Sequence, residues 1–167
     1  SIIDALQEGF DKSEKYNNSY RIGLSDDEIN KKISPDLGLI GISIPFSHLA
    51  RLAHEIIDKI KAKHPNIPIV LGGVYPSSQP EQAINSSADY LVLGEGEEPM
   101  LHLANYLSQN IKELPSYIIN KKSDIKNATN NFSNNINTFP LSFIRSTTLV
   151  PRILFASATE TLPIRQE

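Results

Sequence analysis

Short apolar runs alternate with amphipathic helical patterns along this chain of 167 residues. The run at 67–73 is apolar throughout and ends on two glycines, which is typical of a strand buried on both faces of a parallel sheet. Similar runs at 37–44 and 89–93 predict two more such strands. Residues 1–4 predict the end of a further strand, and 117–119 predict a last edge strand.

Helical patterns fill the intervals between these runs. Apolar residues three and four positions apart along 47–63 predict one strong amphipathic helix. Ser25 and Glu28 have the spacing of a capping box, which predicts a helix start, and Ser78 and Glu81 repeat that spacing. A last helix is expected before the edge strand, because apolar residues recur there at helical spacing.

This alternation predicts an α/β fold, a three-layer Rossmann-like (flavodoxin-like) parallel sheet with helices on both faces. Ligands bind outside the carboxyl ends of the strands in such sheets. Ser43, Gly72, Gly73 and the loop at 94–97 all fall at predicted strand ends. Small residues at three strand ends along one edge indicate a binding site, although a Gly-Gly pair alone is more often a tight turn.

Composition divides the chain into three parts. Residues 1–119 carry the strand and helix patterns and are expected to form one Rossmann-like domain. Residues 120–137 are rich in asparagine, which is typical of an exposed linker. Residues 138–167 regain apolar residues without a clean period, and we interpret them as a carboxyl-terminal extension towards a further domain.

Composition also excludes several classes of function. The net charge is −3 and the pI is about 5.8, so no basic surface predicts a nucleic-acid partner. No apolar run is long enough to cross a bilayer, the first residues lack the pattern of a signal peptide, and we expect a cytoplasmic location. The absence of cysteine excludes disulfides and cysteine-held iron–sulfur clusters within the chain.

Three segments together resemble a known family. They are the residues at 41–43, the glycine-pair segment at 69–77, and the segment at 89–97, which ends in Gly-Glu-Gly-Glu. In this order and spacing they resemble the cobalamin-binding domain of cobalamin-dependent radical SAM proteins. The resemblance covers about residues 2–107, without the first strand and helix of that domain.

The resemblance implies that cobalamin lies with its nucleotide tail against the carboxyl edge of the sheet. Gly72 and Gly73 would let the tail pass close to the backbone, and Ser43 would offer it a hydroxyl. The loop at 94–97 would contact the tail or the corrin rim through backbone groups, because its carboxylates repel a phosphate. The candidate cofactor-binding residues are Ser43, Phe46, Gly72, Gly73, Val74, Gly94, Glu95 and Gly96.

The resemblance further implies that the partner is a radical SAM catalytic domain in a longer protein. That domain would carry the iron–sulfur cluster and S-adenosylmethionine, so this chain alone would not be catalytic. We assign no metal-ligating residue, because the family signature that supplies an axial histidine to cobalt elsewhere is absent. His48 is expected to be a solvated histidine in a first helical turn.

Two other interpretations stay open. The missing first strand favours a degenerate Rossmann-like interaction module that binds no cofactor. A receiver- or flavodoxin-like domain is favoured less, because a receiver needs an acidic cluster at a strand end. Asp4 alone does not supply that cluster, and it is expected to cap the helical turn that follows it.

Overall fold

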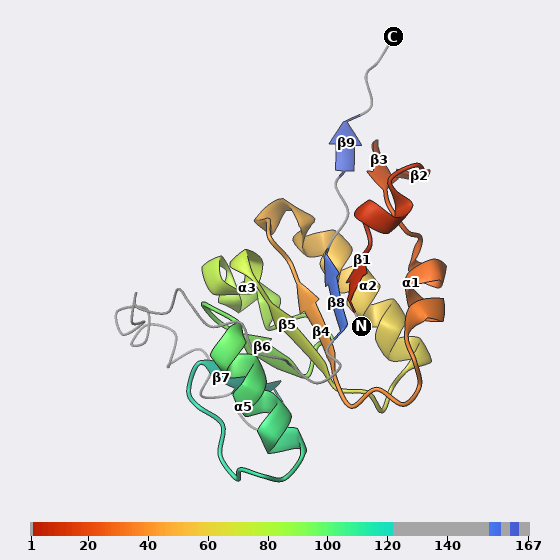
Figure 1. The fold of residues 1–167 in the computed structure, drawn as a ribbon. Helices are drawn as coiled ribbons and strands as arrows, with labels where there is room; N and C mark the ends of the chain where they lie inside the picture. The colour runs from red at the N-terminus through yellow and green to blue at the C-terminus, as the bar shows by residue number, and fades with distance from the viewer. Residues whose placement is uncertain (1, 122–153, 158–160, 164–167) are drawn as a thin grey trace.

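A six-stranded sheet forms the centre of the part of the chain that the structure describes. The computed structural model describes residues 2–121, 154–157 and 161–163. The strand order is β1-β8-β4-β5-β6-β7 (Figure 1). These strands are β1 (Ile3–Asp4), β4 (Ile40–Ser43), β5 (Ile69–Gly72), β6 (Tyr90–Val92), β7 (Ile118–Asn120) and β8 (Leu154–Ser157). All neighbours pair in parallel except β7, which runs antiparallel to β6 at the edge.

Helices connect the parallel strands. They are α1 (Asp26–Lys32), α2 (Ala50–Lys63), α3 (Val74–Ser78), α4 (Pro80–Ala83) and α5 (Glu97–Leu107), with short 3-10 turns η1 (Gln7–Gly9) and η2 (Ser47–Leu49). No helix among the described residues is long and apolar enough to cross a membrane.

Two apolar cores cover the two faces of the sheet. Alternate residues of a strand point to opposite faces, so Ile69 and Leu71 join the core under α1 and α2. Val70 lies on the other face, in the core that contains Met100 and Leu103 of α5. Figure 1 shows α2 and α5 on opposite sides of β5. The predicted α/β fold with helices on both faces is therefore confirmed.

The predicted helix starts have different outcomes. At α1 the Ser25 side chain accepts a hydrogen bond from the Glu28 amide, and the Glu28 carboxylate accepts one from the Ser25 amide, so this capping box is confirmed. The capping box predicted at Ser78 and Glu81 is wrong. Helix α3 already begins at Val74, and the Ser78 hydroxyl donates to the Tyr75 carbonyl of the same helix. Asp4 accepts a hydrogen bond from the Gln7 amide, as expected of a cap.

A second, three-stranded sheet was not predicted. Strands β2 (Ser13–Tyr16) and β3 (Ser19–Ile22) form a hairpin, and β9 (Thr161–Pro163) pairs antiparallel with β3. The sequence at β2 is polar and its residues are exposed or half-buried, so it carries little of the apolar alternation that identifies a strand.

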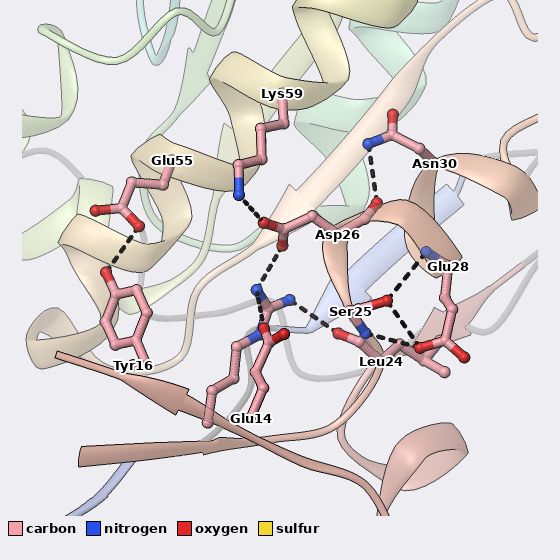
Figure 2. A network of polar contacts seen from close by, with 10 residues as sticks. Glu14, Tyr16, Leu24, Ser25, Asp26, Glu28, Asn30, Glu55 and Lys59 are labelled. Atoms are coloured by element: carbon pink, nitrogen blue, oxygen red, sulfur yellow. Dashed lines mark hydrogen bonds and ion pairs between the residues drawn. The ribbon is translucent and has the colours of Figure 1, made fainter.

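A buried arginine attaches this hairpin to the main domain. Arg21 of β3 is only 2% exposed, and its guanidinium donates to Asp26 at 2.5 Å and to the Leu24 carbonyl at 2.9 Å. Asp26 also accepts a hydrogen bond from Lys59 of α2, as Figure 2 shows, so its carboxylate connects this arginine to α2. Burial raises the pKa of Asp26, but the hydrogen bonds from Lys59 and Arg21 outweigh burial and hold the pKa below its ordinary value.

We expect the substitution Asp26→Asn to destabilise the fold. It removes the charged partner of a buried guanidinium, and hydrogen bonds to charged groups contribute about 1.5–3 kcal/mol. Because the folded pKa is the lower one, the ionised carboxylate stabilises the fold above the unfolded pKa, and this contribution is lost as the pH falls through the folded pKa. Urea unfolding at pH 7 and at pH 3 measures the loss of stability and its pH dependence. We expect the difference in the free energy of unfolding between parent and variant to be smaller at pH 3 than at pH 7.

The control is Asp36→Asn, which changes the same side-chain type at an exposed position. It should leave the free energy of unfolding within about 0.5 kcal/mol of the parent at both pH values. Equal losses from the two substitutions would contradict the role given to Asp26.

Candidate functional site

A cavity of about 520 Å³ opens at the carboxyl ends of β4, β5 and β6. Ligand pockets in proteins fall between about 300 and 1,000 Å³. The lining residues are Gly41, Ile42, Ser43, Val70, Gly72, Gly73, Val74, Ser77, Ser78, Val92, Gly94, Glu95, Gly96 and Met100. This is the edge where ligands bind in open parallel sheets.

The register of the strands explains why the cavity exists. Gly41 lies opposite Val70, and Ser43 lies opposite Gly72. Residues directly opposite each other in adjacent strands share a face of the sheet, so these four residues present one surface to the α5 side. Two of them have no side chain and the serine has a short one, and the surface between β4 and β5 is therefore hollow.

Gly73 forms the turn that carries the chain from β5 into α3. Its φ is +97° and its ψ is −166°, a conformation that is essentially restricted to glycine. A β-carbon there would lie 2.8 Å from the Ile44 carbonyl oxygen and 3.0 Å from the Ser43 hydroxyl oxygen. The Ile44 amide also donates to the Gly72 carbonyl at 3.0 Å. The glycine pair thus brings the ends of β4 and β5 into direct backbone contact.

Ser77 connects this turn to the loop that follows β6. Its hydroxyl donates to the Gly73 carbonyl at 2.8 Å and accepts a hydrogen bond from the Gly94 amide at 2.9 Å. Gly94 has φ +77°, so the third strand end also turns sharply. Ser77 was not among the candidate residues, although it ends the segment at 69–77 that carries the resemblance.

Tyr75, two residues after Gly73, attaches the same turn to the apolar core. Tyr75 is fully buried, its amide donates to the Ile44 carbonyl, and its hydroxyl forms a 2.9 Å hydrogen bond with His54 Nε2. Burial raises the pKa of Tyr75 and lowers the pKa of His54. Both shifts favour a neutral tyrosine and a neutral imidazole, so this pair holds α3 against α2 without a buried charge.

Seven of the eight candidate residues line the one cavity. They are Ser43, Gly72, Gly73, Val74, Gly94, Glu95 and Gly96. Phe46 lies outside the lining, is 51% exposed, and stacks on His48 with ring centroids 5.6 Å apart. His48 is exposed in η2, as expected of a solvated histidine. Whether these residues bind a cofactor stays a prediction.

Most of the lining is apolar, its polar side chains are three serines and Glu95, and only Glu95 carries a charge. The carboxylates of Glu95 and Glu97 belong to exposed residues, and the adjacent α5 begins with Gly96 as its N-cap without a side-chain cap. Within the described residues, no three His, Asp or Glu side chains are grouped so as to hold a metal ion. The cavity is therefore suited to a flat, largely apolar group that hydrogen-bonds serine hydroxyls and backbone groups.

Comparison with known proteins identifies a similar domain. Residues 25–104 match the family model of the B12 binding domain. The match runs from the start of α1 into α5 and includes all fourteen residues that line the cavity. It supports a cobalamin-binding domain with a Rossmann-like fold and cobalamin as its ligand. No curated protein and no solved structure matched the chain.

We expect Gly73→Ala to destabilise the fold by about 1–3 kcal/mol, the range for a residue held in a sparsely populated backbone conformation. The added β-carbon also meets the Ile44 carbonyl. Thermal and urea unfolding measure the loss. Gly72→Ala is the matched control, since a β-carbon there would make only ordinary contacts, 3.9 Å from Val92. If both alanine variants lose the same stability, the strain assigned to Gly73 is wrong.

We expect Ser77→Ala to loosen the loop after β6. The variant loses both hydrogen bonds of the hydroxyl, which contribute about 1 kcal/mol each, and Gly94 loses the acceptor of its amide. Hydrogen exchange of the Gly94 amide should become faster in this variant. Ser78→Ala should leave that amide unchanged, because the Ser78 hydroxyl bonds Tyr75 and Ser47 instead. If the Gly94 amide exchanges at the same rate in Ser77→Ala as in the parent, Ser77 does not hold the loop after β6.

Proposed function

We propose that this chain is a cobalamin-binding domain that holds the nucleotide tail of the corrinoid in the cavity between β4, β5 and β6. The observation that carries the proposal is the coincidence of three side-chain-poor strand ends on one hollow edge, inside the segment that matches the B12 binding domain. An apolar cavity with a few convergent polar groups is the expected form of a cofactor site.

The lining residues fit such a tail. The glycines at 41 and 72 leave space for a planar ring to lie on the backbone between two strands. Val70, Val92 and Met100 provide apolar walls for that ring. The hydroxyl of Ser43 and the backbone groups of residues 95 and 96 are candidates to bind the polar sugar and phosphate, since the Gly94 amide already donates to Ser77. When bound, cobalamin supplies the cobalt centre, and the chemistry at cobalt belongs to the cofactor.

Charge limits how the tail can lie. The cavity lining contains no basic side chain, and Glu95 repels a phosphate. We therefore infer that the phosphate faces solvent or the free N–H groups at the start of α5, and not the Glu95 carboxylate. Binding would then depend on shape and desolvation more than on ion pairs, so its affinity should change little with salt concentration.

We further propose that the domain serves a radical SAM protein. The support is the sequence resemblance in the order and spacing of its glycine segments. Because the chain has no cysteine, the iron–sulfur cluster and the S-adenosylmethionine site of such a protein would lie in another domain. The corrinoid held here would be presented to that catalytic domain.

The binding experiment uses hydroxocobalamin and the whole chain. After mixing and gel filtration, we expect the visible absorption of the corrinoid to co-elute with the protein. The melting temperature should rise with cobalamin concentration, because a ligand that binds only the folded state stabilises it. Gly72→Val should weaken binding by at least tenfold, because its side chain would fill the space between Ser43 and Val92.

Gly38→Val is the matched control. Gly38 is exposed, lies outside the cavity lining, and a β-carbon there meets no atom within 4 Å. This variant should bind cobalamin like the parent. A folded parent chain that retains no cobalamin and shows no thermal shift would overturn the proposed function. Equal binding by the two valine variants would move the site away from this cavity.

A further inference from the structure

Strand β8 comes from the carboxyl-terminal part of the chain and lies in the interior of the main sheet. It pairs in parallel with β1 on one side and with β4 on the other. Figure 1 shows it as the blue arrow between β1 and β4. The matched segment, residues 25–104, contains neither β8 nor β1. An interior strand of the sheet is therefore supplied from outside the recognised domain.

The chain from β1 to β4 creates the place that β8 fills. The chain leaves β1, passes through the β2–β3 hairpin and α1, and returns as β4, two strand positions from β1, so that one position is left between them. Two strands that flank an empty position lie roughly 10 Å apart, too far for hydrogen bonds between them. With β8 in place, Ile3, Ile40 and Ile42 on the two flanking strands are buried, and β8 supplies the partners that buried backbone groups need. The slot therefore requires a strand.

The register places the end of β8 beside the cavity. Ser157 lies opposite Ser43 on one side and opposite Asp4 on the other. Ser43 lines the cavity, so the strand next to the cavity wall is β8. If β8 left the slot, the strand that carries Ser43 would become a sheet edge and the wall would lose its support.

The same segment is attached at a second point. Strand β9 begins at Thr161, four positions after Ser157, and Thr161 lies opposite Arg21 of β3. Arg21 is the buried arginine that attaches the hairpin to α1 and α2. Strand β8 thus belongs to the main sheet and β9 to the small sheet. The 32 residues between Lys121 and Leu154 are long enough for the chain to return to this sheet, at roughly 3.3 Å per extended residue.

We propose that the β1–β4 slot is a strand-acceptor site for this chain's own residues 154–157, and that cobalamin retention requires the slot to be filled in this way. The second half of this inference rests on the proposed function. The first half does not, and the experiments below separate the two.

The absence of cysteine makes the slot testable by cross-linking. The double variant D4C/S157C joins two residues that lie directly opposite each other in paired strands, within the Cα separation that a disulfide accepts. The double variant D4C/A156C is the matched control, because a shift of one residue puts the two β-carbons on opposite faces of the sheet. We expect the first pair to form an intrachain disulfide under mild oxidation and the control pair to form none.

The size of the cross-linked species tests the source of the strand. A monomer on non-reducing gel electrophoresis supports insertion within one chain. Disulfide-linked dimers would overturn it in favour of strand exchange between two copies. If both cysteine pairs cross-link equally, or if neither pair cross-links, the register that places Asp4 opposite Ser157 is wrong.

Cobalamin retention tests the functional half of the inference. Ala156→Pro removes a backbone N–H from an interior strand, and proline is not tolerated in the middle of a sheet. We expect this variant to retain cobalamin at least tenfold less well and to lose hydrogen-exchange protection at the amides of residues 40–43. Leu162→Pro makes the same change in β9, outside the main sheet, and should preserve both properties. Equal retention by the two proline variants would overturn the requirement.

The cross-linked variant supplies an independent measurement. Oxidised D4C/S157C should retain cobalamin as well as its reduced form, because the disulfide keeps β8 in the slot. Loss of cobalamin on oxidation would overturn the requirement for β8. If the parent binds no cobalamin, the proposed function fails, while the cross-link and the exchange data still decide whether β8 fills the slot.

Discussion

The turn at Gly73 lies in direct backbone contact with the end of β4. The Ile44 amide donates to Gly72, the Tyr75 amide donates to Ile44, and no β-carbon fits at Gly73. These contacts bring the ends of two parallel strands together and start α3 directly below the cavity. Ser77 then extends the connection to the third strand end at Gly94. The shape of the cavity thus follows from a backbone geometry that only glycine allows.

A site built in this way recognises a ligand by shape. Its walls are strand backbones, valines and a methionine, and its polar groups are three serine hydroxyls and backbone amides. No basic side chain lines it, so a phosphate gains little attraction there, whereas a planar ring gains contact with two glycine-lined strands. Among the ligands of α/β sheets, a cofactor with an aromatic tail agrees with this lining better than a free phosphate, which would need a cationic partner.

The sequence was most informative where burial controls the pattern. Strands β4, β5 and β6 are buried on both faces, so their apolar runs were recognised, and the capping box at Ser25 was recognised because its hydrogen bonds are local. The hairpin β2–β3 was missed because its sequence is mostly polar. Its buried residue, Arg21, is paired with Asp26, and no local pattern predicts that pair. Seven of the predicted site residues line one cavity, because the parallel strands that carry them all end at the same edge of the sheet. Phe46 also follows a strand end, but it lies outside the cavity lining.

Strand β8 could not be predicted from its local sequence pattern. Its place in the sheet depends on which strand position the rest of the chain leaves without a hydrogen-bonding partner. The resemblance lacked a first strand, and that gap was the reason to consider a degenerate module without a ligand. In the structure an interior position lies between β1 and β4, and residues 154–157 occupy it with parallel pairing on both sides. A sheet requires a strand of the right direction and register at each interior position, but it does not require a particular chain order. The strand beside Ser43 is therefore supplied by residues 154–157, which lie more than a hundred positions further along the chain.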